Sequence, residues 1–179
     1  MLEQNNTQLM IIDVQGKLAQ LMHDKETLFS NLNTLTKAAS LMELPIIWVE
    51  QIPDKLGPTI EEISQELSHQ TPIAKDVFSA WGETNVREAT NASDRKQVLL
   101  VGIEAHICVH QTACDLLQAG YEVHLVTDAV SSRTQANKDL ALKRLAQEGA
   151  VLTSTEMALF ELQKVARGEQ FKSLLKLIK

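Results

Sequence analysis

VLLVGIEAHICVHQTACDLLQAG, residues 98–120, contains the clearest indication of the fold class in this chain. It begins with an apolar run, Val98–Gly102, that shows no alternation with polar side chains, which is typical of a parallel strand covered on both faces. Apolar residues then recur at helical spacing over residues 109–117, and Gly120 is placed to end that helix. Another apolar run, Tyr121–Val126, follows directly. Strand, helix and strand in this order predict an α/β protein.

The same alternation continues on both sides of this unit. Three further apolar runs predict strands: Gln8–Ile12, Pro45–Val49 and Ala150–Leu152. Residues 72–81 have a shorter extended character that is interrupted by Gly82, and helical periodicity covers residues 28–42 and 134–148. In the second of these helices four residues are predicted to face inward: Ala136, Leu140, Ala141 and Leu145. The predicted fold is a three-layer α/β/α, Rossmann-like, doubly wound and mostly parallel sheet with right-handed crossovers.

Composition excludes several classes of protein. The 179 residues are 44% hydrophobic and 22% charged, which fits one globular domain spanning residues 1–179. A net charge of -6 argues against nucleic acid as a partner, and no apolar run approaches the ~18 residues of a membrane span. Residues 1–6 lack the features of a signal peptide, and Cys108 and Cys114 do not form a disulfide framework. We therefore expect a cytoplasmic protein.

Three polar residues lie where parallel strands are predicted to end. Asp13 ends the first strand, Lys75 lies at the end of the short extended segment, and Cys108 follows Val98–Gly102 by a short loop. Ligand sites of open α/β sheets lie beyond these carboxyl ends, so the three side chains are expected to converge. A helix start and a nearby lysine both lower a thiol pKa from about 8.5. Asp13 would take the thiol proton, and first-turn amides would bind an oxyanion.

Each of these residues also has a purely structural explanation. A free cysteine is often buried, an aspartate after a strand often shapes a turn, and a lysine is usually solvated. Cys114 is rotated away from Cys108 on the helix and is predicted to be an unreactive core residue. His106 and His110 lack a third ligand nearby, so no metal is predicted. No glycine-rich phosphate loop is present in the sequence, and no cofactor is expected.

Several motifs resemble those of a known family. They are Leu9–Gln15, Lys75–Trp81 and Gly102–Val109, and in this order and spacing they are similar to the isochorismatase-like cysteine hydrolases, which include nicotinamidases and carbamoyl-cleaving amidases. The loop formed by Glu50–Pro53 and Leu56–Thr59 looks closest to the branch of isochorismatase domain-containing proteins. The resemblance covers most of the chain. It implies the same three-layer fold.

The resemblance also implies roles for individual residues. Asp13 would be the general base, Lys75 would hold the carboxylate and thiolate in place, and Cys108 would be the nucleophile. A non-proline cis peptide is implied at Ile103–Glu104, where it would direct amides near residues 104 and 108 at the oxyanion. Four residues are expected to line the substrate pocket: Gln15, Gln51, Trp81 and His106. Simple core packing is the alternative for Trp81.

Two departures from related families limit the function. Zinc-containing nicotinamidases carry histidines after the second strand, whereas Trp48–Gln51 offers none, so neither zinc nor nicotinamidase activity is expected. True isochorismatases lack the nucleophilic cysteine, so Cys108 argues against hydrolysis of a vinyl ether. We expect a hydrolase that cleaves a small amide or related C–N bond through a thioester. The alternatives are a non-covalent hydrolase that uses Asp13 and a catalytically silent binding module on the same fold.

The resemblance further implies a homo-oligomer. The tail Phe171–Ile178 is rich in Leu and Lys, and its apolar side chains need a surface to cover. This tail is therefore a candidate contact between subunits. Docking of the tail on its own subunit is the alternative.

Overall fold

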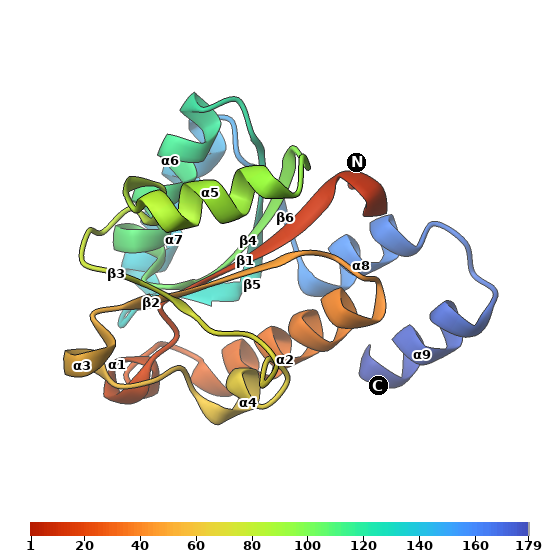
Figure 1. Ribbon diagram of the computed structural model, residues 1–179, viewed down its shortest axis with the longest axis horizontal. Coiled ribbons are helices and arrows are strands. Elements are labelled where there is room, and N and C mark those ends of the chain that lie inside the picture. The colour runs from red at the N-terminus through yellow and green to blue at the C-terminus, as the bar shows by residue number, and fades with distance from the viewer. Residues whose placement is uncertain (179) are drawn as a thin grey trace.

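A six-stranded sheet forms the centre of the molecule in the computed structural model, which describes residues 1–178 (Figure 1). The strands are β1 (Thr7–Ile12), β2 (Ile46–Gln51), β3 (Ile73–Lys75), β4 (Gln97–Ile103), β5 (Glu122–Ser131) and β6 (Val151–Thr153). Their order across the sheet is β3-β2-β1-β4-β5-β6, and every neighbouring pair is parallel. This confirms the predicted doubly wound α/β fold.

Helices cover both faces of the sheet. They are α1 (Gly16–Gln20), α2 (Lys25–Leu41), α3 (Pro53–Leu56), α4 (Glu61–Ser64), α5 (Thr84–Ala92), α6 (His110–Gln118), α7 (Gln135–Gln147), α8 (Thr155–Gln163) and α9 (Glu169–Ile178). Figure 1 shows α5, α6 and α7 on one face, with α2, α4 and α9 on the other. Alternate residues of β1 enter the two cores: Leu9 and Ile11 face the α2 side, while Met10 and Ile12 face the α6 side. Burial on both faces explains why the strand is apolar throughout.

Three local predictions differ from the structure. Helix α5 was not predicted because its sequence is polar, and only Val86 and Thr90 in it are buried. Strand β5 extends past the predicted end at Val126 to Ser131, with a register shift against β4. On α7 the inward prediction is correct for Ala141 and Leu145 and wrong for Ala136 and Leu140, which are exposed. The buried stripe of α7 is narrower than its apolar periodicity suggests.

The C-terminal tail forms α9, which packs against α2 and α8 of the same chain. Leu174 is fully buried in this contact, and Leu177 and Ile178 pack against the same core. This arrangement favours the alternative in which the tail docks on its own subunit. The sequence predicted that the apolar side chains of the tail would cover a surface, whereas the identity of that surface is set by the position of α2.

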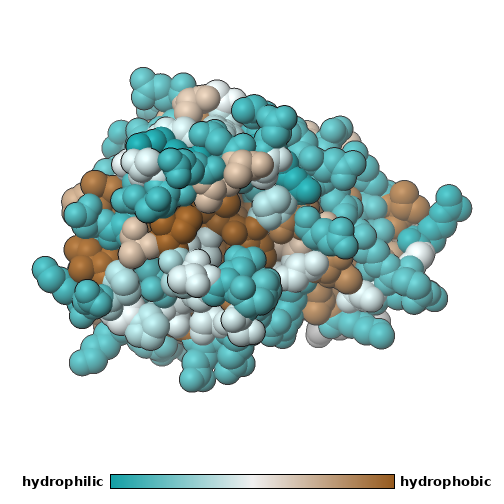
Figure 2. All heavy atoms as spheres, viewed as in Figure 1, coloured by the Kyte–Doolittle hydropathy of each residue, from teal (hydrophilic) through white to brown (hydrophobic). Residues whose placement is uncertain are grey.

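The face of the molecule drawn in Figure 2 is mostly hydrophilic. Figure 2 shows apolar side chains exposed in a band across the middle of one face, at the level of the sheet in Figure 1. Val77 and Phe78, directly after β3, are among the exposed large apolar residues. Within residues 1–178 no helix combines the length and apolar character needed to cross a membrane.

Candidate active site

The site lies where the strand order reverses. Asp13 follows β1, Lys75 ends β3, and Cys108 lies in a π-helical turn, Ala105–Val109, between β4 and α6. From β1 the chain proceeds to β2 and β3 on one side, and it then crosses to β4 on the other side of β1. The connections that follow β1 and β4 leave the carboxyl ends of these strands toward opposite faces of the sheet. A crevice therefore forms between β1 and β4. The structure therefore brings the three predicted residues to one place.

The Lys75 ammonium group donates hydrogen bonds to three acceptors. Its Nζ lies 2.7 Å from Asp13 Oδ2 and 3.1 Å from the carbonyl oxygen of Val77, and it also donates to Gln51 Oε1. The side chains of Lys75 and Asp13 are 0% and 2% exposed. An ammonium group has three protons, so these contacts use all of its donors. Lys75 therefore holds Asp13 and Gln51 in place rather than contacting a ligand.

Asp13 has one free carboxylate oxygen. Its Oδ1 is buried and has no hydrogen-bonding partner in the described part of the chain, while Oδ2 is held by Lys75. The backbone of Asp13 has a φ of 54°, a left-handed conformation that aspartate tolerates better than most residues. Burial raises the pKa of the Asp13 carboxyl, and the Lys75 ammonium opposes this rise. A buried, unpaired oxygen with a raised pKa is suited to accept a proton.

Cys108 is a buried thiol beside this carboxyl. Burial, followed by the Asp13 charge, raises the pKa of Cys108 to about 12, although the Lys75 ammonium acts in the opposite direction. The sequence predicted a lowered pKa, and that prediction is wrong for the resting site. The physical reason is that Lys75 is already paired with Asp13, so its charge does not outweigh burial and the carboxylate. The resting group is therefore a neutral thiol that needs an adjacent base.

A cavity of about 170 Å³ opens beside these groups. Its lining residues are Asp13, Leu18, Gln51, Leu56, Phe78, Ile103, Glu104, Ile107 and Cys108. More than half of them are aliphatic or aromatic, so the cavity is mainly apolar. Two of its polar residues, Asp13 and Gln51, lie together because both accept from Lys75 Nζ. Four apolar members, Leu18, Leu56, Phe78 and Ile107, were not predicted. Phe78 lies in the middle of the motif Lys75–Trp81 and is 59% exposed. An aromatic residue within that motif was the available signal.

Among the four predicted pocket residues, Gln51 lines the cavity and the other three lie outside it. Gln15 is buried and ties two loops together: its Oε1 accepts from Gln51 N at 2.7 Å, and its Nε2 donates to Gly57 O at 2.8 Å. The Trp81 ring packs edge-on against Tyr121 at 5.4 Å, which matches the core-packing alternative. His106 Nδ1 lies 2.9 Å from Ser132 Oγ. Each of these three side chains contacts a partner outside the cavity, and the sequence does not predict these partners.

The segment before Cys108 contains the expected backbone feature. The Ile103–Glu104 peptide is cis. The Glu104 carboxylate is buried and accepts from Arg133 N at 3.0 Å and from Arg133 Nε at 3.2 Å. Gly102 precedes the segment with a φ of 117°, and a Cβ there would lie 2.1 Å from the carbonyl oxygen of Ile12. Glycine therefore lets β4 approach β1 closely next to the site.

A buried polar network positions the loop that carries Leu56. Glu50 Oε1 accepts from both Thr59 N and Thr59 Oγ1 at 2.7 Å. Trp48 Nε1 donates to the same hydroxyl oxygen at 2.8 Å. Because buried charges are costly without partners, these contacts fix the loop against β2. This structural role of Glu50 was not predicted from the sequence.

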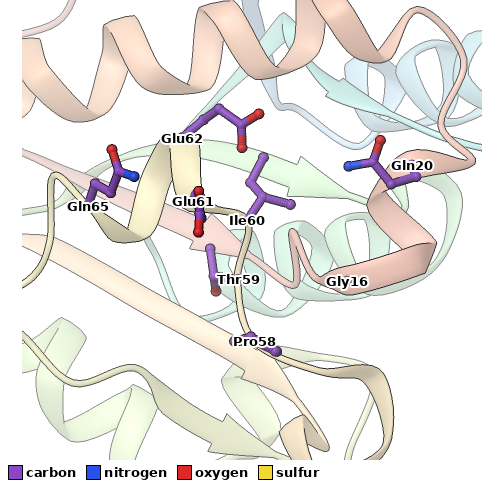
Figure 3. A pocket seen from close by; sticks show the side chains of 8 residues that line it. All are labelled: Gly16, Gln20, Pro58, Thr59, Ile60, Glu61, Glu62 and Gln65. Carbon is purple, nitrogen blue, oxygen red and sulfur yellow. The ribbon is translucent and has the colours of Figure 1, made fainter.

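A wider hollow of about 510 Å³ lies nearby and has a different character (Figure 3). Figure 3 shows its lining from residues 58–65 and from the start and end of α1, with Glu61 and Glu62 as its charged members. Both carboxylates are exposed, and no cysteine is among the described residues that line the hollow. Size alone therefore does not identify the site, and the smaller cavity beside Cys108 is the candidate because it combines a thiol with a buried carboxyl group.

The fold and this site define an isochorismatase-type hydrolase domain. Residues 7–157 match the Isochorismatase domain, and the chain belongs to this family. It is 42% identical over 175 residues to the secreted isochorismatase effector Isc1 of Phytophthora sojae, covering 96% of this chain and 83% of that protein.

Solved structures show the same architecture. The MAR1 ribonuclease of Caenorhabditis elegans is 35% identical with a TM-score of 0.92, covering 99% of this chain and 91% of that one. YcaC of Pseudomonas aeruginosa, solved with hexane-2,5-diol and covalent acrylamide, is 26% identical with a TM-score of 0.92, covering 98% and 90%. YcaC of Escherichia coli, described as an octameric hydrolase of unknown specificity, is 24% identical with a TM-score of 0.93, covering 98% and 89%.

Proposed function

We propose that this chain is a cysteine-dependent hydrolase that cleaves a small amide or related C–N bond through a thioester on Cys108. The observation that carries the proposal is the unpaired, buried Oδ1 of Asp13 in the same cavity wall as the Cys108 thiol. A neutral thiol next to an available carboxylate is the arrangement that nucleophilic catalysis requires.

The proposed reaction has two halves. Asp13 takes the Cys108 proton as sulfur attacks the carbonyl carbon, and amides near residues 104 and 108 bind the oxyanion. The C–N bond then breaks, and Asp13 returns the proton to the departing nitrogen. Water, deprotonated by Asp13, next attacks the thioester, which releases a carboxylic acid and restores the thiol. Lys75 keeps its proton throughout because its donors hold Asp13, Gln51 and Val77 in place.

The covalent acrylamide in YcaC of Pseudomonas aeruginosa supports a reactive nucleophile in a relative of the same fold. Of residues 1–178, no group of three or more His, Cys, Asp or Glu side chains is arranged to hold a metal ion.

The test compares the wild-type chain with Cys108→Ala. We expect ammonia release from a library of small amides by the wild type, a thioester on Cys108 by mass spectrometry after acid quench, and neither in Cys108→Ala. The circular dichroism spectra of the two proteins should agree. Turnover by Cys108→Ala at the wild-type rate would contradict the proposal and favour a non-covalent hydrolase that uses Asp13.

We also propose a cytoplasmic homo-oligomer. Cys108 and Cys114 are both free, as in a reducing compartment, although a relative is a secreted effector. The octameric YcaC supports assembly of this fold into oligomers. A small-molecule substrate, without nucleic acid, agrees with the net charge of -6.

A further inference from the structure

The cavity beside Cys108 disfavours negatively charged ligands. Its lining contains two carboxyl groups, on Asp13 and Glu104, and lacks any lysine or arginine. Lys75 lies behind Asp13 with all three ammonium donors engaged, and the exposed guanidinium of Arg133 is held by Glu104. A substrate carboxylate placed here would lose its hydration beside two carboxylates, and the two nearby cations, Lys75 and Arg133, are already paired with them. An anionic substrate is therefore disfavoured on electrostatic grounds.

The polar end of the cavity has an oriented neutral donor. An ammonium group only donates hydrogen bonds, so the atom of Gln51 that faces Lys75 is its carbonyl oxygen. The NH2 group of Gln51 is then the part of this side chain available to the cavity. It can donate to an oxygen of an uncharged ligand. This donor and the free Oδ1 of Asp13 complement the C=O and the NH2 of a carboxamide, respectively.

The small volume of the cavity restricts both the acyl group and the nitrogen substituent of such a ligand. At about 170 Å³ the cavity is smaller than the roughly 300–1,000 Å³ of usual ligand pockets. The acyl end would contact the apolar side chains of Leu18, Leu56 and Phe78. Asp13 and Lys75 are almost fully enclosed, which leaves little room for a substituted nitrogen beside the carboxyl group.

We propose that the substrates are uncharged primary carboxamides with a short aliphatic acyl group, and that Phe78 limits the length of that group. This inference rests on the function proposed above. The reaction balances: the carboxamide and the Cys108 thiol give an acyl thioester and ammonia, and water then converts the thioester into the carboxylic acid and the thiol. The acid ionises, and repulsion from Asp13 and Glu104 favours its release.

The test uses three amides of nearly equal size with the full-length chain. Isovaleramide is uncharged, malonamate replaces its two methyl groups by carboxylate oxygens, and N-methylisovaleramide carries a substituted nitrogen. We expect kcat/KM for isovaleramide to exceed the values for the other two by at least tenfold. Release of ammonia or methylamine measures turnover, and the mass of acylated Cys108 measures thioester formation.

Phe78→Ala tests the length limit, because this side chain is largely exposed and its loss should not unfold the protein. We expect the ratio of kcat/KM for octanamide to that for isovaleramide to rise at least tenfold. Leu140→Ala is the matched control, since Leu140 is 55% exposed on α7 and lies outside the cavity lining. An unchanged ratio in Phe78→Ala would overturn the role of Phe78.

The remaining outcomes separate this inference from the proposed function. Thioester formation with malonamate as fast as with isovaleramide would overturn the substrate class and leave the cysteine mechanism standing. Equal turnover of the N-methyl amide would overturn the restriction to primary amides. Failure of every amide, charged ones included, to acylate Cys108 or release an amine would overturn the proposed function and this inference with it.

Discussion

Lys75 Nζ lies 2.7 Å from Asp13 Oδ2 although β2 separates their strands in the sheet. The pair spans β2 because Gln51, at the end of that strand, is in register with Lys75 and accepts from the same ammonium group. The carboxyl ends of three parallel strands thus converge on one buried charge. The geometry of the site depends on this register.

Loss of the buried ammonium should destabilise the protein. Lys75→Met leaves Asp13 buried without its partner, and we expect the free energy of unfolding to fall by about 3–5 kcal/mol. Urea denaturation followed by circular dichroism measures this. The double variant Asp13→Leu, Lys75→Met should recover part of the loss, because it removes the unpaired charge. A Lys75→Met protein as stable as the wild type would show that the pair is not the electrostatic anchor of the site.

The pH dependence of Cys108 alkylation should reveal a suppressed thiolate. Because the pKa of Cys108 is raised to about 12, the rate with iodoacetamide should increase about tenfold per pH unit from pH 7 to pH 9.5 without a plateau. Removal of the carboxylate in Asp13→Asn should lower the pKa of Cys108 and move the curve to lower pH. Peptide mass spectrometry separates Cys108 from Cys114.

A plateau in the wild type near or below pH 8.5 would contradict this prediction. It would instead indicate a resting thiolate paired with Lys75, as the sequence suggested. Circular dichroism at each pH is the control for unfolding.

Gly102 should not tolerate a side chain. In Gly102→Ala the new Cβ meets the Ile12 backbone at 2.1 Å, and backbone cannot move aside as a flexible side chain can. We expect the free energy of unfolding to fall by at least ~2 kcal/mol more than it does in Gly120→Ala. Gly120 shares a positive φ but has open space around the added carbon. Thermal or urea denaturation compares the two. Equal losses would show that positive φ alone, rather than close approach of β4 to β1, accounts for the effect.

The tail should stabilise its own subunit. Leu174→Ala removes a buried side chain from the contact of α9 with α2, and we expect the free energy of unfolding to fall by about 2–5 kcal/mol. The exposed Lys176→Ala on the same helix should change stability by less than ~0.5 kcal/mol. Sedimentation of a chain ending near Arg167 tests whether the tail also forms a contact between subunits. A smaller assembly with an intact fold would make the tail a contact between subunits.

Much of the fold follows from local patterns in the sequence. Apolar runs such as Val98–Gly102 are buried on both faces, so they lack alternation and are recognisable. The residues that end them, Asp13 and Lys75, are predictable for the same reason, because parallel strands present their carboxyl ends at one edge. Helix α5 escaped prediction because it is short and polar, and only two of its side chains, Val86 and Thr90, are buried.

Local sequence patterns are sufficient to predict most of the strand positions, the alternation of strands with helices, and the positions of Asp13, Lys75 and Cys108 at the sheet edge. The neighbours that these three groups meet depend on the tertiary structure. Gln51 and Phe78 line the cavity while Trp81 and His106 turn to partners elsewhere, and burial beside Asp13 raises the Cys108 pKa that local position was expected to lower. Periodicity is a property of adjacent residues, whereas desolvation and charge pairing depend on segments that only the folded chain brings together.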